Sequence, residues 1–153
     1  MNWQWLAIPG AAVIAALLFR RYVGFLTRAH AHSMWPTLRP GQFLLTRSLR
    51  RRRQIRHGDI VVAQSPELAQ YIVKRVVGLP GDRLVLGSTG LVRNGMHVAE
   101  PYVSYAGGRS GSWVVPEGHC FLLGDNRAAS SDSRSWKQPF APLDRIVGRV
   151  SGG

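Results

Sequence analysis

The chain has 153 residues, 45% of them hydrophobic, and a formal net charge of +12 at pH 7. This length suits one domain with at most a short appendage, and the apolar content is enough to bury a core. A single cysteine, Cys120, excludes an internal disulfide and a cysteine-based metal site. His30 and His32 have no carboxylate or third ligand nearby in the sequence. We therefore expect no metal and no cofactor.

The positive charge is concentrated in one short stretch, which contains Arg47, Arg50, Arg51, Arg52, Arg53 and Arg56. Such an excess indicates a negatively charged neighbour, either nucleic acid or an anionic membrane surface. A solvated, arginine-rich loop is the simpler alternative. The N-terminal sequence favours anionic lipid headgroups near Arg50 to Arg53, and we expect no nucleic-acid partner.

Residues 3–19 carry no charge and are followed by two arginines. As a helix this stretch would span roughly 25 Å, against a bilayer core of about 30 Å. Aromatic residues near both ends are typical interfacial anchors: Trp3, Trp5 and Tyr22. We expect residues 1–26 to be a single transmembrane anchor and residues 27–153 a β-rich domain. A cleaved signal peptide and a buried core helix are the alternatives.

A proline-rich loop follows at residues 31–41. Pro36 keeps Trp35 out of helical geometry, and Pro40-Gly41 forms a turn, so we expect an ordered loop. It contains Ser33 within reach of the predicted anchor. A serine beside a proline is most often only a turn former.

Beyond residue 26 no amphipathic helix is apparent. Short runs of β-branched and aromatic residues alternate with turn formers, and Asn94-Gly95 is a strong hairpin signal. We expect strands at residues 42–46, 60–63, 71–77, 83–86, 91–98, 113–115, 119–123 and 146–150, with an edge strand at 102–105. Many short strands at this spacing are typical of an antiparallel sheet or a partly open barrel.

One of the two lysines lies inside an apolar strand. Of twenty basic residues, eighteen are arginine and only Lys74 and Lys137 are lysine. Lys74 would share its strand face with Ile72 and Val76. Burial disfavours an ammonium ion and lowers its pKa, and a neutral amine can act as a general base, which arginine cannot. A strand lysine with its head in water is the alternative.

The stretch at residues 124–134 is polar and has little periodicity. Its charged members can form an internal network of acceptors and forked donors: Asp125, Arg127, Asp132 and Arg134. We expect this loop to act as a scaffold for a neighbouring group rather than as a flexible linker.

Four blocks together resemble the type I signal peptidase family, which uses a serine–lysine dyad. They are Ser33-Met34-x-Pro36-Thr37-Leu38, Gly58-Asp59-Ile60-Val61-Val62, Lys74-Arg75-x-x-Gly78-Leu79-Pro80-Gly81-Asp82, and Gly124-Asp125-Asn126-Arg127-x-x-Ser130-x-Asp132-Ser133-Arg134. They occur in the family's order and, with the anchor, span nearly the whole chain.

The resemblance implies a partly open antiparallel β-barrel with one N-terminal transmembrane helix, and assigns roles to residues. Ser33 would be the nucleophile and Lys74 the general base. Ser130 would orient the lysine, with Asp132, Arg134, Asp125 and Arg127 as the supporting network. The backbone N–H of Ser33 would bind the oxyanion. Ala31 stands where some members have a second donor, a serine hydroxyl, so this chain must use another donor, rely on the backbone alone, or be slow.

The resemblance also implies the substrate and the location. Substrates would be preproteins with small residues at −1 and −3 of the scissile bond, bound by Met34, Leu38, Ile72 and Val73. The accessory β-domain of larger members would be reduced to one or two hairpins at about residues 83–115. The catalytic domain would lie on the extracytoplasmic side of the cell membrane, although the positive-inside rule favours the opposite orientation.

Two other functions remain open at this stage. The chain could be a specialised relative that matures one dedicated precursor, and its short length favours this alternative. A basic, membrane-anchored β-domain could instead bind lipid or nucleic acid without catalysis, and Ser33 and Lys74 would then be dispensable. A self-cleaving regulator of the LexA type shares the dyad chemistry, but the hydrophobic N-terminus and the absence of a helix-turn-helix pattern argue against it.

Overall fold

The computed structural model describes residues 10–13, 24–49, 55–65 and 67–151. Most of the predicted membrane anchor, and the arginines Arg50 to Arg53 predicted to meet lipid, lie outside these residues. Within the described part of the chain, no helix has the length and apolarity needed to cross a membrane.

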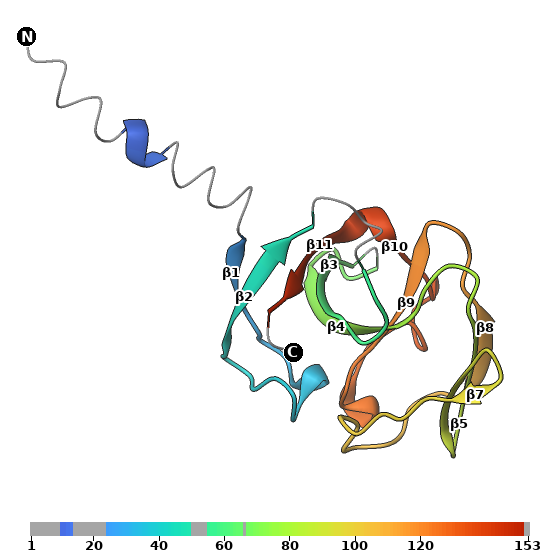
Figure 1. Ribbon diagram of the computed structural model, residues 1–153. Coiled ribbons are helices and arrows are strands. Elements are labelled where there is room, and N and C mark those ends of the chain that lie inside the picture. Colours follow the sequence, from blue (N-terminus) through green and yellow to red (C-terminus); the bar gives the residue numbers. More distant parts are fainter. Residues whose placement is uncertain (1–9, 14–23, 50–54, 66, 152–153) are drawn as a thin grey trace, which may run out of the picture.

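Two antiparallel sheets make up the fold (Figure 1). The larger has seven strands in the order β1-β2-β11-β3-β4-β9-β10 and curls into a half-barrel. Its strands are β1 (Phe25–Arg28), β2 (Phe43–Ser48), β3 (Ile60–Gln64), β4 (Tyr71–Gly78), β9 (His119–Leu123), β10 (Ala141–Pro142) and β11 (Ile146–Val150). The predicted class, mainly β with antiparallel pairing, is confirmed.

The smaller sheet lies to one side of the half-barrel and has the order β7-β6-β5-β8. Its strands are β5 (Arg83–Gly87), β6 (Gly90–Arg93), β7 (Met96–His97) and β8 (Gly111–Val114). The predicted Asn94-Gly95 turn joins β6 to β7, and both residues have the positive φ that such a turn needs, 54° and 82°. The described residues also contain three short 3-10 helices, η1 (His32–Met34), η3 (Arg127–Ala129) and η4 (Leu143–Arg145), and a helical stretch at residues 10–13 (Figure 1).

The pair β3–β4 forms the centre of the large sheet. Both strands are rich in β-branched residues, which suit a pleated, buried surface. Lys74 lies directly opposite Val61, which is fully buried. Residues from both faces of the pair enter separate core clusters: Ile72 and Val76 pack with Trp136, whereas Val62 packs with Met34 and Leu38. The strand that carries Lys74 is therefore rigidly supported.

Two local predictions differ from the structure. Phe25 and Leu26, assigned to the anchor, belong to β1, where Leu26 lies opposite Leu45. Residues 102–105 do not form a strand, since only Tyr105 makes an isolated parallel bridge, to Asn126. Tyr102, Val103 and Tyr105 are residue types that favour strands, but the Tyr105 carbonyl accepts a hydrogen bond from Ala128 N–H in the 124–134 loop instead.

Gly78 ends β4 where the two sheets meet. A Cβ atom at this position would lie 2.6 Å from Leu84 Cδ1, 3.0 Å from Val115 Cγ2 and 3.1 Å from Phe121 Cβ. The junction thus leaves no room for a side chain.

We expect Gly78→Ala to lower the free energy of unfolding by about 1–3 kcal/mol, because overpacking displaces these neighbours. Gly87→Ala is the matched control, since a Cβ there meets nothing within 4 Å. It should be neutral or slightly stabilising. Urea denaturation of both variants measures the difference, and equal stabilities would contradict the packing described here.

Candidate active site

Ser33 and Lys74 line the same cavity, which has a volume of about 600 Å³. Ser33 comes from η1 and Lys74 from β4. Ser33 is 8% exposed and Lys74 only 4% exposed. The structure thus brings the two predicted dyad residues, both largely buried, to one cavity, although they are 41 positions apart in the sequence.

The amine of Lys74 is in an unusual state for a lysine. Burial lowers its pKa from 10.5 to about 8. The carboxylate of Asp132 acts in the opposite direction, and the charge of Arg134 supports the lowering. A substantial fraction of this amine is therefore neutral near pH 8, as a general base requires.

Asp132 and Arg134 form a buried pair behind Lys74. Arg134 donates from Nε to Asp132 Oδ1 at 2.8 Å and from Nη2 to Oδ2 at 2.8 Å. Burial would raise the pKa of Asp132, but the hydrogen bonds and charge of Arg134 lower it below the usual value. Asp132 also accepts from the Gly124 N–H at 3.0 Å, which closes the 124–134 loop on itself.

A second buried pair connects this loop to β4. Arg75 donates to both carboxylate oxygens of Asp125, at 2.9 and 2.7 Å. Asp125 also accepts from the hydroxyl of Thr37 at 2.6 Å. One carboxylate thus joins the strand of Lys74 to the segment that follows Ser33. Bidentate geometry fixes orientation as well as distance.

The turn that carries Ser33 is also held from the 124–134 loop. Asn126 N–H donates to the carbonyl of Ser33 at 3.0 Å, and Asn126 Nδ2 donates to the carbonyl of His32 at 3.3 Å. Gly124 lies so close that a Cβ atom there would be 2.5 Å from the Ser33 carbonyl oxygen and would collide with Ser130 Oγ. Only glycine allows this contact.

Ser130 supplies a buried hydroxyl beside this contact. Its side chain is one of the hydrogen-bond donors that lower the pKa of Asp132. Ser130 therefore belongs to the polar network around Asp132, the carboxylate whose charge acts on Lys74.

The other predicted site residues divide into two groups. Met34, Ile72 and Val73 line the cavity, whereas Leu38 does not and packs in the core cluster that contains Met34. Asp125, Arg127, Asp132 and Arg134 are all buried in the network behind the cavity.

Sequence reasoning also missed several residues of the site. Further cavity residues come from β1 and the two residues after it, from β3, from the start of β4 and the turn before it, and from η3 and the loop after it: Thr27, Arg28, Ala29, His30, Val62, Leu68, Gln70, Tyr71, Ala129 and Ser131. Ala31, already singled out in the sequence, lines the cavity as well. Arg75 and Thr37 were quoted only as motif positions, and their bond to Asp125 could not be seen without the fold. No three His, Cys, Asp or Glu side chains in the described part of the chain gather to hold a metal ion.

Comparison with known proteins decides the family. The profile described as "Signal peptidase, peptidase S26" matches residues 2–152. The chain belongs to the signal peptidase family, peptidase S26. It is a hydrolase of the signal peptidase I type. A signal peptidase I from Bacillus caldolyticus is 36% identical over 97% of this chain and 87% of the relative. One from Bacillus licheniformis is 35% identical over 86% of this chain and 77% of the relative.

A solved structure supports the same family. A crystal structure of a signal peptidase I from Enterococcus faecalis has a TM-score of 0.58 and 28% identity, and covers 64% of this chain and 97% of the solved chain. The curled antiparallel half-barrel is therefore the signal peptidase fold.

The two lysines allow a direct test of the buried amine. With ¹³C-labelled lysine Cε, only two signals arise, from Lys74 and from the exposed Lys137. We expect Lys74 to titrate near pH 8, because burial disfavours its charged form. A Lys137→Arg variant assigns the signals. Titration of Lys74 near 10.5 would show that the amine is hydrated.

Proposed function

We propose that this chain is a membrane-bound serine endopeptidase that removes signal peptides, with Ser33 as nucleophile and Lys74 as general base. The observation that carries the proposal is a buried lysine with a lowered pKa in the same cavity as a serine. A serine hydroxyl is a poor nucleophile until a neighbouring base takes its proton, and a neutral lysine can replace histidine in that role.

In the first half of the reaction, Lys74 Nζ takes the hydroxyl proton as Ser33 Oγ attacks the scissile carbonyl. The backbone N–H of Ser33 stabilises the oxyanion of the tetrahedral intermediate. Ser130 Oγ orients the lysine. The C–N bond then breaks, and the ammonium of Lys74 returns its proton to the leaving amine.

Water attacks the resulting acyl-enzyme in the second half. Lys74 takes a proton from that water, and Ser33 regains its hydroxyl proton when the second tetrahedral intermediate collapses. Ala31 lines the cavity but has no hydroxyl to donate, so the backbone N–H of Ser33 has no serine side chain to assist it from that position. Loss of one such donor typically costs about 3–4 kcal/mol of transition-state stabilisation.

The cavity walls suit small side chains at −1 and −3. Besides Ser33 and Lys74, the cavity lining includes five apolar side chains: Ala29, Ala31, Met34, Ile72 and Val73. We propose preproteins with an Ala-x-Ala type site as substrates. Their hydrophobic signal segments would be held by the same bilayer that the predicted anchor enters, on the extracytoplasmic side.

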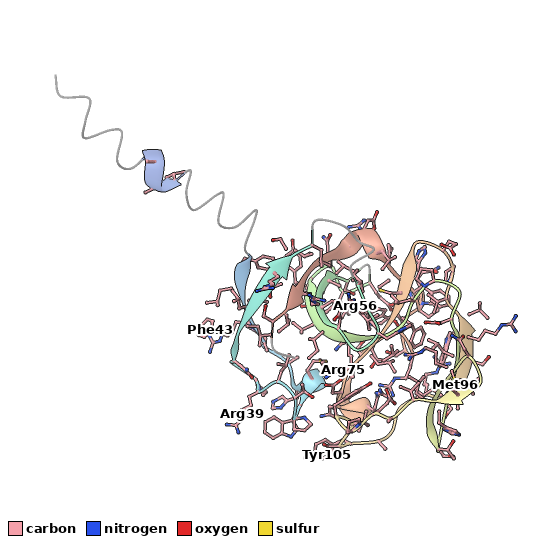
Figure 2. The ribbon with its side chains drawn as sticks, viewed as in Figure 1. Arg39, Phe43, Arg56, Arg75, Met96 and Tyr105 are labelled. Carbon is pink, nitrogen blue, oxygen red and sulfur yellow. The ribbon has the colours of Figure 1, made fainter. Side chains whose placement is uncertain are left out.

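An exposed apolar and basic face supports the membrane location. On the outer side of the β1–β2 pair, Leu26 is 65% exposed, Phe43 64% and Leu45 46%. Phe43 lies at the periphery of the molecule, next to Arg28 in the register (Figure 2). Apolar side chains interleaved with arginines suit an interface with anionic lipid, as we propose also for Arg50 to Arg53.

We expect Ser33→Ala and Lys74→Arg each to lower kcat/KM at least about 10³-fold on a peptide with an Ala-x-Ala site. Arginine keeps the charge of Lys74 but cannot give up its proton. Wild-type activity should rise with pH through about 8, as Lys74 becomes neutral. Peptide cleavage in detergent measures all three effects. An active Lys74→Arg variant would rule out catalysis by a neutral amine.

The membrane face has a separate test. Phe43→Ser with Leu45→Ser should reduce cleavage of a preprotein in anionic vesicles several-fold, yet leave cleavage of a soluble peptide in detergent within two-fold. Val85→Ser with Val114→Ser is the matched control, because these residues are 50% and 59% exposed on the smaller sheet. Equal losses in both double variants would contradict a specific lipid contact.

A further inference from the structure

The segment between β7 and β8, residues 98–110, belongs to none of the family blocks and lies along the 124–134 loop. After β7 the chain leaves the smaller sheet and passes beside η3 before β8 begins. Its backbone receives two hydrogen bonds from the loop: Ala128 N–H donates to Tyr105 O at 3.3 Å, and Arg134 Nη1 donates to Gly107 O at 2.6 Å. Two side chains of this segment also make contacts: Glu100 binds Arg127 of the loop, and Tyr102 lies against Arg75 of β4.

Glu100 binds Arg127 in a buried bidentate pair. Arg127 Nη2 donates to Glu100 Oε1 at 2.6 Å and Nη1 to Oε2 at 3.1 Å. The two side chains are only 8% and 5% exposed. Arg127 Nε also donates to Gly124 O at 3.0 Å. Glu100 therefore acts, through one guanidinium, on the glycine that touches the Ser33 turn.

Tyr102 joins this pair to β4. Its hydroxyl donates to Glu100 Oε1 at 2.9 Å, and its ring lies 3.9 Å from the guanidinium carbon of Arg75. Burial, and then the charge of Glu100, raise the pKa of Tyr102, so the phenol remains a donor. The Arg75 guanidinium binds Asp125 along its edge while Tyr102 covers its face.

We propose that Glu100 and Tyr102 are positioning residues for the reaction: together they clamp the 124–134 loop against β4 and thereby fix Lys74 relative to Ser33. The inference rests on the proposed function of that pair. The clamp has two ends, Arg127 in the loop and Arg75 immediately after Lys74, and Glu100 and Tyr102 connect them through one hydrogen bond.

The clamp acts on Lys74 by keeping water out. Three charged groups act on the amine: Asp132, Arg134 and Asp125. All three belong to the 124–134 loop, which Glu100 holds through Arg127. Without Glu100, the charge of Arg127 is buried and unpaired, and such a group moves toward solvent. A loosened loop hydrates Lys74 and favours its ammonium form.

The sign of the effect separates positioning from simple electrostatics. Loss of the Glu100 charge alone would lower the pKa of Lys74, because a negative charge favours the ammonium. Entry of water would raise it. The same lysine-labelled NMR titration reads this directly, in the full chain and without any need for activity.

We expect Glu100→Gln to raise the pKa of Lys74 by about one pH unit. The value of kcat at pH 8 should fall at least about ten-fold, with KM within two-fold. Tyr102→Phe keeps the ring over Arg75 but loses the bond to Glu100, so it should show the same changes to a smaller degree. Glu117→Gln is the matched control, because it removes an equal charge from an exposed turn and should leave both readouts unchanged.

An unchanged or lowered pKa of Lys74 in folded Glu100→Gln overturns the inference. If that variant does not fold, Tyr102→Phe decides by the same criterion. If Ser33→Ala retains activity, the proposed function is wrong, while the titration still decides whether Glu100 controls the environment of Lys74.

Discussion

The arrangement of the site depends on one interaction: the amine of Lys74 is buried away from water, and its neighbours determine its charge. Burial lowers the pKa of Lys74, yet Asp132 next to it would restore the charge if Arg134 did not bind that carboxylate on both oxygens. Between about pH 8 and 10.5 the unfolded chain binds the extra proton, so stability rises with pH across this window. At neutral pH the buried amine therefore costs on the order of 3 kcal/mol, which the packing of β3, β4 and β9 must offset.

Two carboxylates in the network behind Lys74 make different contacts. Asp132 binds within the 124–134 loop, where it accepts a hydrogen bond from Gly124 N–H. Asp125 binds outside the loop, to Arg75 on β4 and to Thr37. Because each is held by an arginine with fixed planar geometry, the loop has little freedom to shift. Ala129 and Ser131, which line the cavity, belong to this loop and are therefore held in place as well.

The local part of this arrangement is predictable from the sequence, and the non-local part is not. A lysine among β-branched residues and the Asn94-Gly95 turn are properties of a few neighbouring residues. The pairing of Glu100 with Arg127 spans 27 positions and depends on how the smaller sheet meets the larger one. Leu38 was assigned to the pocket from its motif position, but its side chain lies in the core cluster with Met34. Phe25 and Leu26 continue an apolar run, which hides their pairing in β1.

The strand order has a consequence for synthesis of the protein. Among the described residues β11 is the C-terminal strand, yet it lies between β2 and β3 in the large sheet, and the loop that holds the Ser33 turn is completed only at residue 134. A ribosome-bound chain that already displays both Ser33 and Lys74 therefore lacks the parts that hold them together. The cavity that Ser33 and Lys74 share is therefore completed only after the strand that carries Lys74 and the turn that carries Ser33 have both been synthesised.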